Sequence, residues 1–128
     1  MWTAPSERSR ATSSDARECL AAATVTLDGD LPSRAISEAY DSMFAAAKTA
    51  LSEEDVFART HAGVWHRFYE LFVATGRFPA ELHVRAGKGA EERLKADYES
   101  ARYSHEDGLD AVRAAERFLG ATLEMLEE

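Results

Sequence analysis

The chain has 128 residues, of which 45% are hydrophobic and 30% are charged, and its formal net charge is −8. This balance is typical of soluble globular proteins and excludes the disordered and membrane classes; no run of 18 apolar residues is present. The acidic charge also argues against a protein that coats nucleic acid without specificity. We expect residues 1–128 to form a single domain, with residues 1–10 as a poorly ordered N-terminal segment.

Two amphipathic segments fill the first part of the chain. A first helix is predicted over Ser13–Val25 and ends before the turn-forming residues 28–30. The second helix is predicted to begin near Asp30 or Leu31, with Pro32 tolerated in its first turn. Its apolar residues recur at helical spacing: Ile36, Tyr40, Met43, Phe44, Ala47 and Leu51.

The middle of the chain predicts a third helix. Ser52, followed by Glu53, Glu54 and Asp55, is typical of a helix start with a serine cap and acidic residues in the first turn. The helix then presents a stripe of side chains to the core: Phe57, His61, Val64, Phe68, Leu71 and Phe72. Gly76 is a suitable residue to end it.

Two further helices are predicted after Pro79. The glycines of Gly87-Lys88-Gly89 each cost about 1 kcal/mol against alanine in a helix, so we expect a break there and a restart near Ala90. Ser104 is expected to cap the last helix, whose apolar residues again recur at helical spacing: Leu109, Val112, Ala115, Phe118, Leu119, Leu123 and Leu126. No segment alternates with a period of two for long enough to predict a strand. The predicted fold is all-α, a four- to five-helix up-and-down bundle.

The candidate site is the segment that contains Arg93, Asp97 and Tyr98. Arg93 and Asp97 are four residues apart and share one face of a helix, and Tyr98 follows about 100° further round. We expect Arg93 to contact a phosphate, Asp97 to hold Arg93 in place, and Tyr98 to stack on the ligand or hydrogen-bond to it. The competing interpretation is a solvated ion pair worth a few tenths of a kcal/mol.

Other constellations in the chain are weaker. Arg59 and His66 fit an R-x6-H spacing, but such a match is expected by chance. His61 and His66 lie about 140° apart around a helix, so they do not form a metal pair, and we expect neither a metal nor a cofactor. The single cysteine, Cys19, cannot form an internal disulfide, which fits a cytoplasmic protein, and we expect it to be buried and unreactive.

Four segments, in the same order, resemble a known family. Residues 35–47 (AISEAYDSMFAAA) resemble a helix that reads A-V-S-R-A-Y-Y-A-M-F-H-A-A, and residues 59–64 (RTHAGV) resemble K-T-H-S-G-V. Residues 75–79 (TGRFP) are similar to a T-G-x-x-P turn, and residues 93–98 (RLKADY) match R-x-x-A-D-Y. All four motifs belong to the small prokaryotic HEPN-domain family, and the resemblance covers roughly residues 31 to 100.

This resemblance implies a bundle of four or five helices that forms homodimers with a cleft near the partner subunit. HEPN proteins of this kind are often encoded beside a minimal nucleotidyltransferase and act in toxin–antitoxin or defence systems. Many are metal-independent ribonucleases with an R-x4–6-H motif, in which the arginine holds the scissile phosphate and the histidine handles the proton of the 2′-hydroxyl. The partners implied are therefore a second copy of the chain, a nucleotidyltransferase, and RNA or a nucleotide.

The chain departs from this pattern at the proton-transfer position. Tyr98 stands where an R-x4-H motif has its histidine, and a tyrosine with a pKa near 10 is a poor base at pH 7. Glu38 and Asp41 replace the family's usual arginine and tyrosine. The leading hypothesis is thus a partner- or nucleotide-binding module. The alternatives are a ribonuclease that uses Tyr98, or His105 from across a dimer, and a purely structural protein in which Arg93 and Asp97 brace a helix.

Overall fold

The computed structural model describes the backbone of residues 4–98 and 102–127 and the side chains of residues 14–97 and 102–127. All regular secondary structure in these ranges is helical, as predicted from the sequence. The elements in chain order are α1 (Ala4–Asp28), α2 (Pro32–Glu53), α3 (His61–Phe68), the π-helical turn η1 (Tyr69–Val73), α4 (Ala80–Tyr98) and α5 (His105–Leu126).

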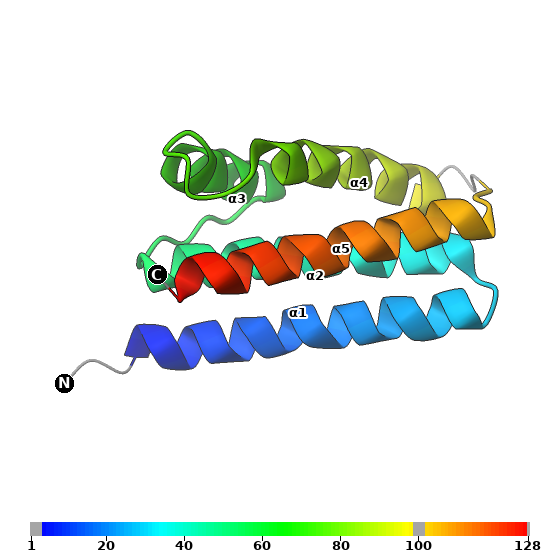
Figure 1. Cartoon of the computed structure of the whole chain (residues 1–128), viewed down its shortest axis with the longest axis horizontal. Coiled ribbons are helices and arrows are strands. Elements are labelled where there is room, and N and C mark those ends of the chain that lie inside the picture. Colours follow the sequence, from blue (N-terminus) through cyan, green and yellow to red (C-terminus); the bar gives the residue numbers. More distant parts are fainter. Residues whose placement is uncertain (1–3, 99–101, 128) are drawn as a thin grey trace.

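Helix α2 lies at the centre of the bundle. It contacts α1, α3, α4 and α5, and Figure 1 shows the long helices running up and down beside one another along the long axis of the molecule. One face of α2 consists of small side chains with no exposed surface: Ala35, Ala39, Ser42, Ala46 and Ala50. The Ser42 hydroxyl donates a hydrogen bond of 2.8 Å to the carbonyl oxygen of Ala16 on α1. Small residues allow the two backbones to approach closely, which holds α1 against α2.

An aromatic cluster packs α3, η1 and α5 together. Phe68, Phe72, Phe78 and Phe118 are all buried, and the ring centroids of Phe68 and Phe78 lie 4.9 Å apart in an edge-to-face arrangement. The rings of Phe78 and Phe118 are 4.8 Å apart. Each fully buried phenylalanine contributes about 1.5–3 kcal/mol through the hydrophobic effect. Of the expected stripe of the third helix, Val64, Phe68 and Phe72 therefore do face the core.

The expected bounds of the first helix are too narrow. Helix α1 extends from Ala4 to Asp28 and so begins before Ser13 and ends after Val25. Pro5 is compatible with this start, because a proline in the first turn removes no hydrogen bond that the helix needs. That residues 1–10 form a poorly ordered segment stays a prediction.

The expected serine cap of the third helix is wrong. Helix α2 continues through Ser52 to Glu53, and Asp55 then leaves the helix with a positive φ of 55°. Helix α3 instead begins at His61, and the Thr60 hydroxyl caps it by accepting a 2.9 Å hydrogen bond from the Gly63 amide. Phe57, expected to face the core, lies outside the helices and is 63% exposed. A serine followed by acidic residues does not show whether the preceding helix has ended, and here the signal lies at the end of α2.

The expected break at Gly87-Lys88-Gly89 is also wrong, since α4 is continuous from Ala80 to Tyr98. Gly89 is buried against α2, and a Cβ added there would lie 3.0 Å from the Met43 Cε and 3.5 Å from the Tyr40 Cδ1. A Cβ added at Gly87 would meet nothing within 4 Å. Gly89 thus allows α4 to approach α2, and this packing outweighs its low helix propensity.

The last helix begins where the sequence predicts. The Ser104 hydroxyl accepts a hydrogen bond of 3.1 Å from the Asp107 amide, and the Asp107 carboxylate accepts one of 3.0 Å from the Ser104 amide. This reciprocal capping box fixes the start of α5. Within the helix, Val112, Phe118 and Leu119 are buried as expected.

The two glycines of α4 give a matched test of how closely α4 approaches α2. We expect Gly89→Val to lower the free energy of unfolding by about 1–3 kcal/mol, because the new side chain overpacks the contact with Met43. Gly87→Val should be neutral or stabilising by about 0.3 kcal/mol, since valine has the higher helix propensity and the space is open. Urea denaturation followed by circular dichroism measures both. Equal stabilities would show that α4 does not depend on a glycine at position 89.

Candidate functional site

Arg93 extends from α4 toward α2 and meets two carboxylates. Its Nε lies 3.1 Å from the Asp41 Oδ1 on α2 and 3.7 Å from the Asp97 Oδ2 on α4. Asp97 is itself held by the Ser37 hydroxyl, which donates a 2.7 Å hydrogen bond to its other carboxylate oxygen. The structure therefore brings Arg93 and Asp97 together as expected and adds Asp41, whose part in the cluster the sequence did not reveal.

These ion pairs determine the net charge of the candidate site. One guanidinium faces two carboxylates, so the cluster of Arg93, Asp41 and Asp97 is net negative when all three are ionised. Burial raises the pKa of Asp41, Arg93 opposes this rise, and Asp97 adds to it. An anion that binds Arg93 must therefore compete with Asp41 for the guanidinium.

Arg93 lines two hollows in the surface of the bundle. One has a volume of about 380 Å³, and we call it the acidic hollow; its lining is Asp15, Glu18, Cys19, Asp41, Phe44, Ala45, Lys48, His61 and Arg93. The other, the aromatic hollow, has a volume of about 420 Å³ and is lined by Tyr40, His61, Ala62, Trp65, Ala90, Arg93 and Leu94. Arg93 and His61 line both hollows, which marks these two residues as the centre of the site.

His61 is held in place by two aromatic residues, Phe44 and Tyr40, and Trp65 in turn holds Tyr40. The His61 ring stacks on Phe44, with centroids 3.9 Å apart and ring planes 18° apart. Its Nδ1 lies 3.3 Å from the Tyr40 hydroxyl oxygen, and the same oxygen accepts a 2.9 Å hydrogen bond from the Trp65 Nε1. Tyr40 is buried, and burial raises its pKa although the Trp65 hydrogen bond and Arg93 oppose the rise. The Tyr40 hydroxyl therefore keeps its proton at neutral pH.

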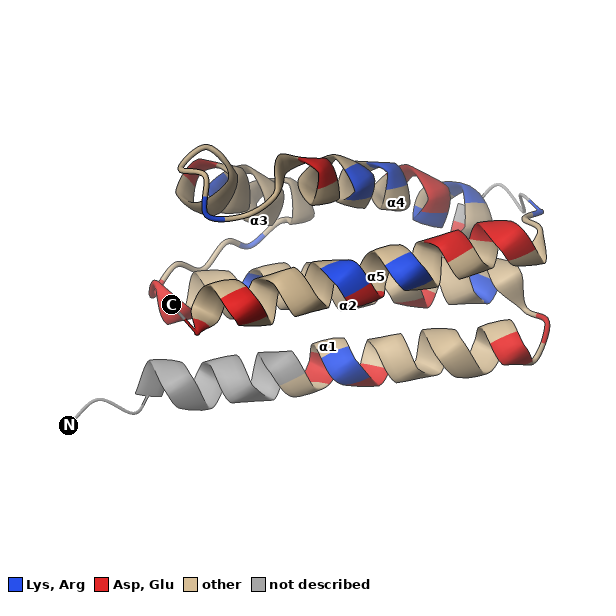
Figure 2. Cartoon of the chain, in the orientation of Figure 1, with Lys and Arg blue, Asp and Glu red and all other residues tan. Residues whose placement is uncertain are grey.

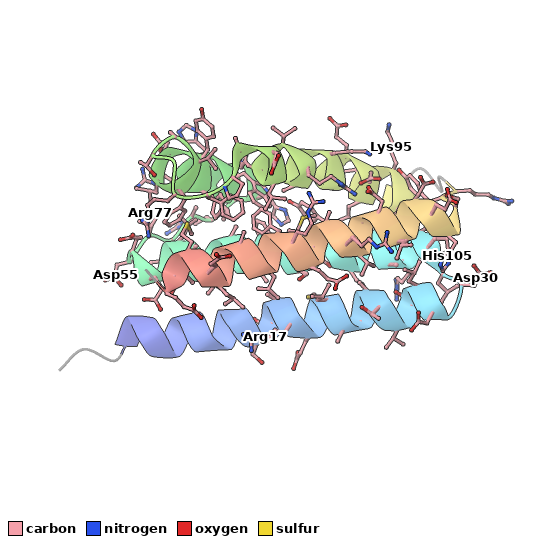
Figure 3. All side chains as sticks on the ribbon, viewed as in Figure 1. Arg17, Asp30, Asp55, Arg77, Lys95 and His105 are labelled. Carbon is pink, nitrogen blue, oxygen red and sulfur yellow. The ribbon has the colours of Figure 1, made fainter. Side chains whose placement is uncertain are left out.

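Among the described side chains, the other sequence-predicted candidates line neither hollow. Tyr98 closes α4, but its side chain lies outside the described part of the structure. His105 begins α5 at the end of the bundle where Asp30 lies (Figure 3), and it lines neither hollow. Arg59 and His66 line neither hollow, and the His66 Nε2 lies 3.4 Å from the Glu70 Oε1 on the surface.

Tyr40, Asp41, His61 and Trp65 are the site residues that sequence reasoning missed. Tyr40 and His61 stand within the segments that resemble the family, and this was the one available signal. Their contact joins positions that are 21 residues apart. No helical periodicity connects residues of two different helices, so the contact becomes visible only in the fold.

Cys19 is half-buried and lines the acidic hollow, whereas the sequence led us to expect a buried position. Burial raises the pKa of the Cys19 thiol, and the carboxylates of Asp41, Asp15, Glu38 and Glu18 raise it further. The thiol therefore stays protonated at neutral pH and is a weak nucleophile. Within the described residues, no group of three or more His, Cys, Asp or Glu side chains is arranged to hold a metal ion.

The charges around the site are mixed. Figure 2 shows basic and acidic residues interspersed along α4. Lys48, which lines the acidic hollow, places its ammonium 4.9 Å from the centroid of the Phe44 ring.

Among the described residues, none of the helices is both long enough and apolar enough to cross a membrane.

The sequence model of the HEPN domain matches residues 10–126 of this chain. The UPF0332 protein glr0978 of Gloeobacter violaceus is 27% identical over 115 residues, which cover 88% of this chain and 91% of the relative. A protein of Methanocaldococcus jannaschii named "Putative toxin MJ0605" is 31% identical over 114 residues, which cover 88% of this chain and 84% of the relative. The chain therefore belongs to the HEPN domain family.

The raised pKa of Asp41 predicts an effect on stability. A carboxyl group whose pKa is raised by folding stabilises the protein at low pH and loses that contribution as the pH rises through the raised pKa. Asp41→Asn should therefore raise the free energy of unfolding at pH 7, by only a few tenths of a kcal/mol because the side chain is 41% exposed and screened by solvent. The gain should shrink toward zero as the pH falls to about 3.9, the ordinary aspartate pKa.

Urea denaturation at pH 7 and pH 4 measures this difference. Asp110→Asn is the control, because Asp110 also pairs with an arginine of α4, at 3.1 Å, but its side chain is 63% exposed. A clear loss of stability in Asp41→Asn at pH 7 would show that the pair with Arg93 outweighs the cost of burying Asp41.

Proposed function

We propose that this chain is the HEPN component of a cytoplasmic toxin–antitoxin or defence pair, of the branch that carries the R-x-x-A-D-Y signature. In this proposal it acts as a homodimer, its partner protein is a minimal nucleotidyltransferase, and it binds a nucleotide through Arg93. Membership of the HEPN family and the name of the archaeal relative support the toxin–antitoxin setting.

The observation that carries the nucleotide proposal is that Arg93 lines both hollows. A nucleotide needs a cation for its phosphate and an apolar surface for its base. Arg93 offers the first, and Trp65 and Leu94 in the aromatic hollow offer the second. The hollow of about 420 Å³ falls within the usual size range of small-molecule sites.

The ion pairs of Arg93 are compatible with this role. Asp97 lies on the same helix and is fixed by Ser37, so it holds the guanidinium in place when a ligand arrives. Asp41 comes from α2 and lines the acidic hollow beside Arg93, so it is the carboxylate that a phosphate would displace. The raised pKa of Asp41 lowers the cost of this exchange, because burial already disfavours its charged form.

Charge-neutral Arg93→Gln tests the proposed role of Arg93. We expect AMP affinity to fall at least tenfold, because a charge-assisted hydrogen bond contributes about 1.5–3 kcal/mol. Isothermal titration of AMP into the wild type and the variant measures the change.

Arg85→Gln is the matched control for this experiment. Arg85 also lies on α4, and its guanidinium also meets two carboxylates, Glu92 at 3.0 Å and Asp110 at 3.1 Å, but it lines neither hollow. The control should lose stability and keep its AMP affinity. Equal AMP binding by both variants would favour the structural alternative, in which Arg93 only braces the helix.

The second candidate function is a metal-independent ribonuclease. It gains from the finding that His61 and Arg93 line the same hollows, since a phosphate-binding cation and an imidazole are the groups such an enzyme needs. The charges oppose it. Asp15, Glu18 and Asp41 line the acidic hollow and repel a polyanion such as RNA. For this reason a small nucleotide is the favoured ligand.

An RNA cleavage assay separates the two candidates. In the presence of EDTA we expect the purified protein to cleave RNA no faster than Arg93→Ala. Time courses on a labelled single-stranded RNA, resolved on denaturing gels, measure the rates. Cleavage by the wild type that is lost in Arg93→Ala would establish the ribonuclease and displace the binding proposal.

A further inference from the structure

We infer that His61 is a second phosphate ligand beside Arg93, that it donates from Nε2, and that the ligand is a nucleoside monophosphate with its base in the aromatic hollow. This inference rests on the proposed nucleotide site at Arg93 and adds to it a residue, a protonation form and a ligand class.

The position of His61 is the first step. His61 begins α3 and Arg93 lies in α4, yet both side chains line the acidic and the aromatic hollow. A ligand that contacts Arg93 at the junction of the two hollows therefore lies within reach of the imidazole. The stacking of His61 on Phe44, 3.9 Å away, restricts rotation of the ring.

The hydrogen bonds around Tyr40 favour one position for the ring proton of His61. The Trp65 Nε1 can only donate, so the Tyr40 oxygen is the acceptor in that 2.9 Å bond. The hydroxyl proton of Tyr40 is then free to point at the His61 Nδ1, 3.3 Å away. An Nδ1 that accepts this bond has no proton of its own, and neutral His61 carries its single ring proton on Nε2.

This form of His61 is a donor. Its Nε2–H makes no hydrogen bond to a described side chain, so it remains available to an anion in the hollows that the ring lines. Together the Arg93 guanidinium and the His61 Nε2–H offer a phosphate two kinds of donor from two helices. The same form makes His61 a poor base, because its one unprotonated nitrogen is occupied by Tyr40.

The surroundings of the pair define the class of ligand. The aromatic hollow presents Trp65 and Leu94 and suits a flat base. The acidic hollow, which Arg93 also lines, presents Asp15, Glu18 and Asp41, against the single ammonium of Lys48. Additional phosphates beyond the first would extend into this negative region, so a monophosphate is favoured over a triphosphate.

Fluorescence of Trp65 provides a direct readout. Trp2 and Trp65 are the two tryptophans of the chain, so a Trp2→Phe background leaves Trp65 as the sole reporter. We titrate AMP, ATP, ribose 5-phosphate and adenosine into this protein. AMP should change the Trp65 emission and bind at least tenfold more tightly than each of the other three compounds. Ribose 5-phosphate lacks the base, adenosine lacks the phosphate, and ATP carries additional negative charge.

Two substitutions at His61 separate donation from packing. His61→Phe keeps the ring stacked on Phe44 and removes both nitrogens, and it should weaken AMP binding about tenfold or more. His61→Gln places an amide donor near the position of Nε2 and should retain most of the affinity. Equal AMP affinity in His61→Phe and the wild type would overturn the role of His61. If Arg93→Gln nevertheless lost AMP binding, the proposed function would still stand.

The ring proton is measured independently of any ligand. A long-range proton–nitrogen NMR correlation of ¹⁵N-labelled histidine distinguishes the two neutral forms, with resonances assigned by the loss of the His61 signals in His61→Gln. We expect the form with the proton on Nε2, and Tyr40→Phe should shift it toward a mixture. A proton on Nδ1 in the wild type would overturn the inference.

The nucleotide titrations decide the ligand class and the proposed function. Tighter binding of ATP than of AMP would overturn the ligand class, and binding of no nucleotide by the wild type would overturn the proposed function itself.

Discussion

The close packing of four helices around α2 is the constraint on which the rest of the structure depends. Alanines and Ser42 on one face of α2 allow α1 to approach closely, and Gly89 allows α4 to approach the opposite side. That opposite side carries Ser37, Tyr40, Asp41 and Phe44, the residues that meet Arg93, Asp97 and His61. A bulkier α2 or α4 would separate these groups, so the geometry of the site follows directly from the packing of the core.

Electrostatics then decides what the site can accept. Arg93 is the cation that both hollows share, and Asp41 and Asp97 compensate its charge before any ligand arrives. The carboxylates partner a guanidinium that is only partly exposed, and they also compete with an anion for it. The balance disfavours long polyanions and favours a ligand that brings one phosphate together with an apolar group to fill the aromatic hollow.

Local signals in the sequence predicted the all-α fold and one part of the site. The capping box of Ser104 and Asp107 and the spacing of Arg93 and Asp97 are contacts within four residues, and the sequence predicted both. It failed at Gly89 and Ser52, where tertiary packing overrides the local propensity. It also failed to join His61 to Tyr40 or Asp41 to Arg93, because these contacts connect different helices and leave no periodic pattern.

The fold places a histidine, His61, beside Arg93, although Tyr98 stands where an R-x4-H motif has its histidine. Tyr98 occupies the position that a proton-transferring histidine has in many HEPN ribonucleases, and His61 lies beside Arg93 from another helix. Proximity alone does not make this imidazole equivalent, because in the tautomer that we infer Nδ1 accepts a hydrogen bond from Tyr40 and is occupied. A base must present an unprotonated nitrogen to the substrate, whereas a phosphate ligand must present a proton. The Trp65–Tyr40–His61 chain, with the tautomer that we infer, favours the second chemistry and so supports the binding proposal over the cleavage proposal.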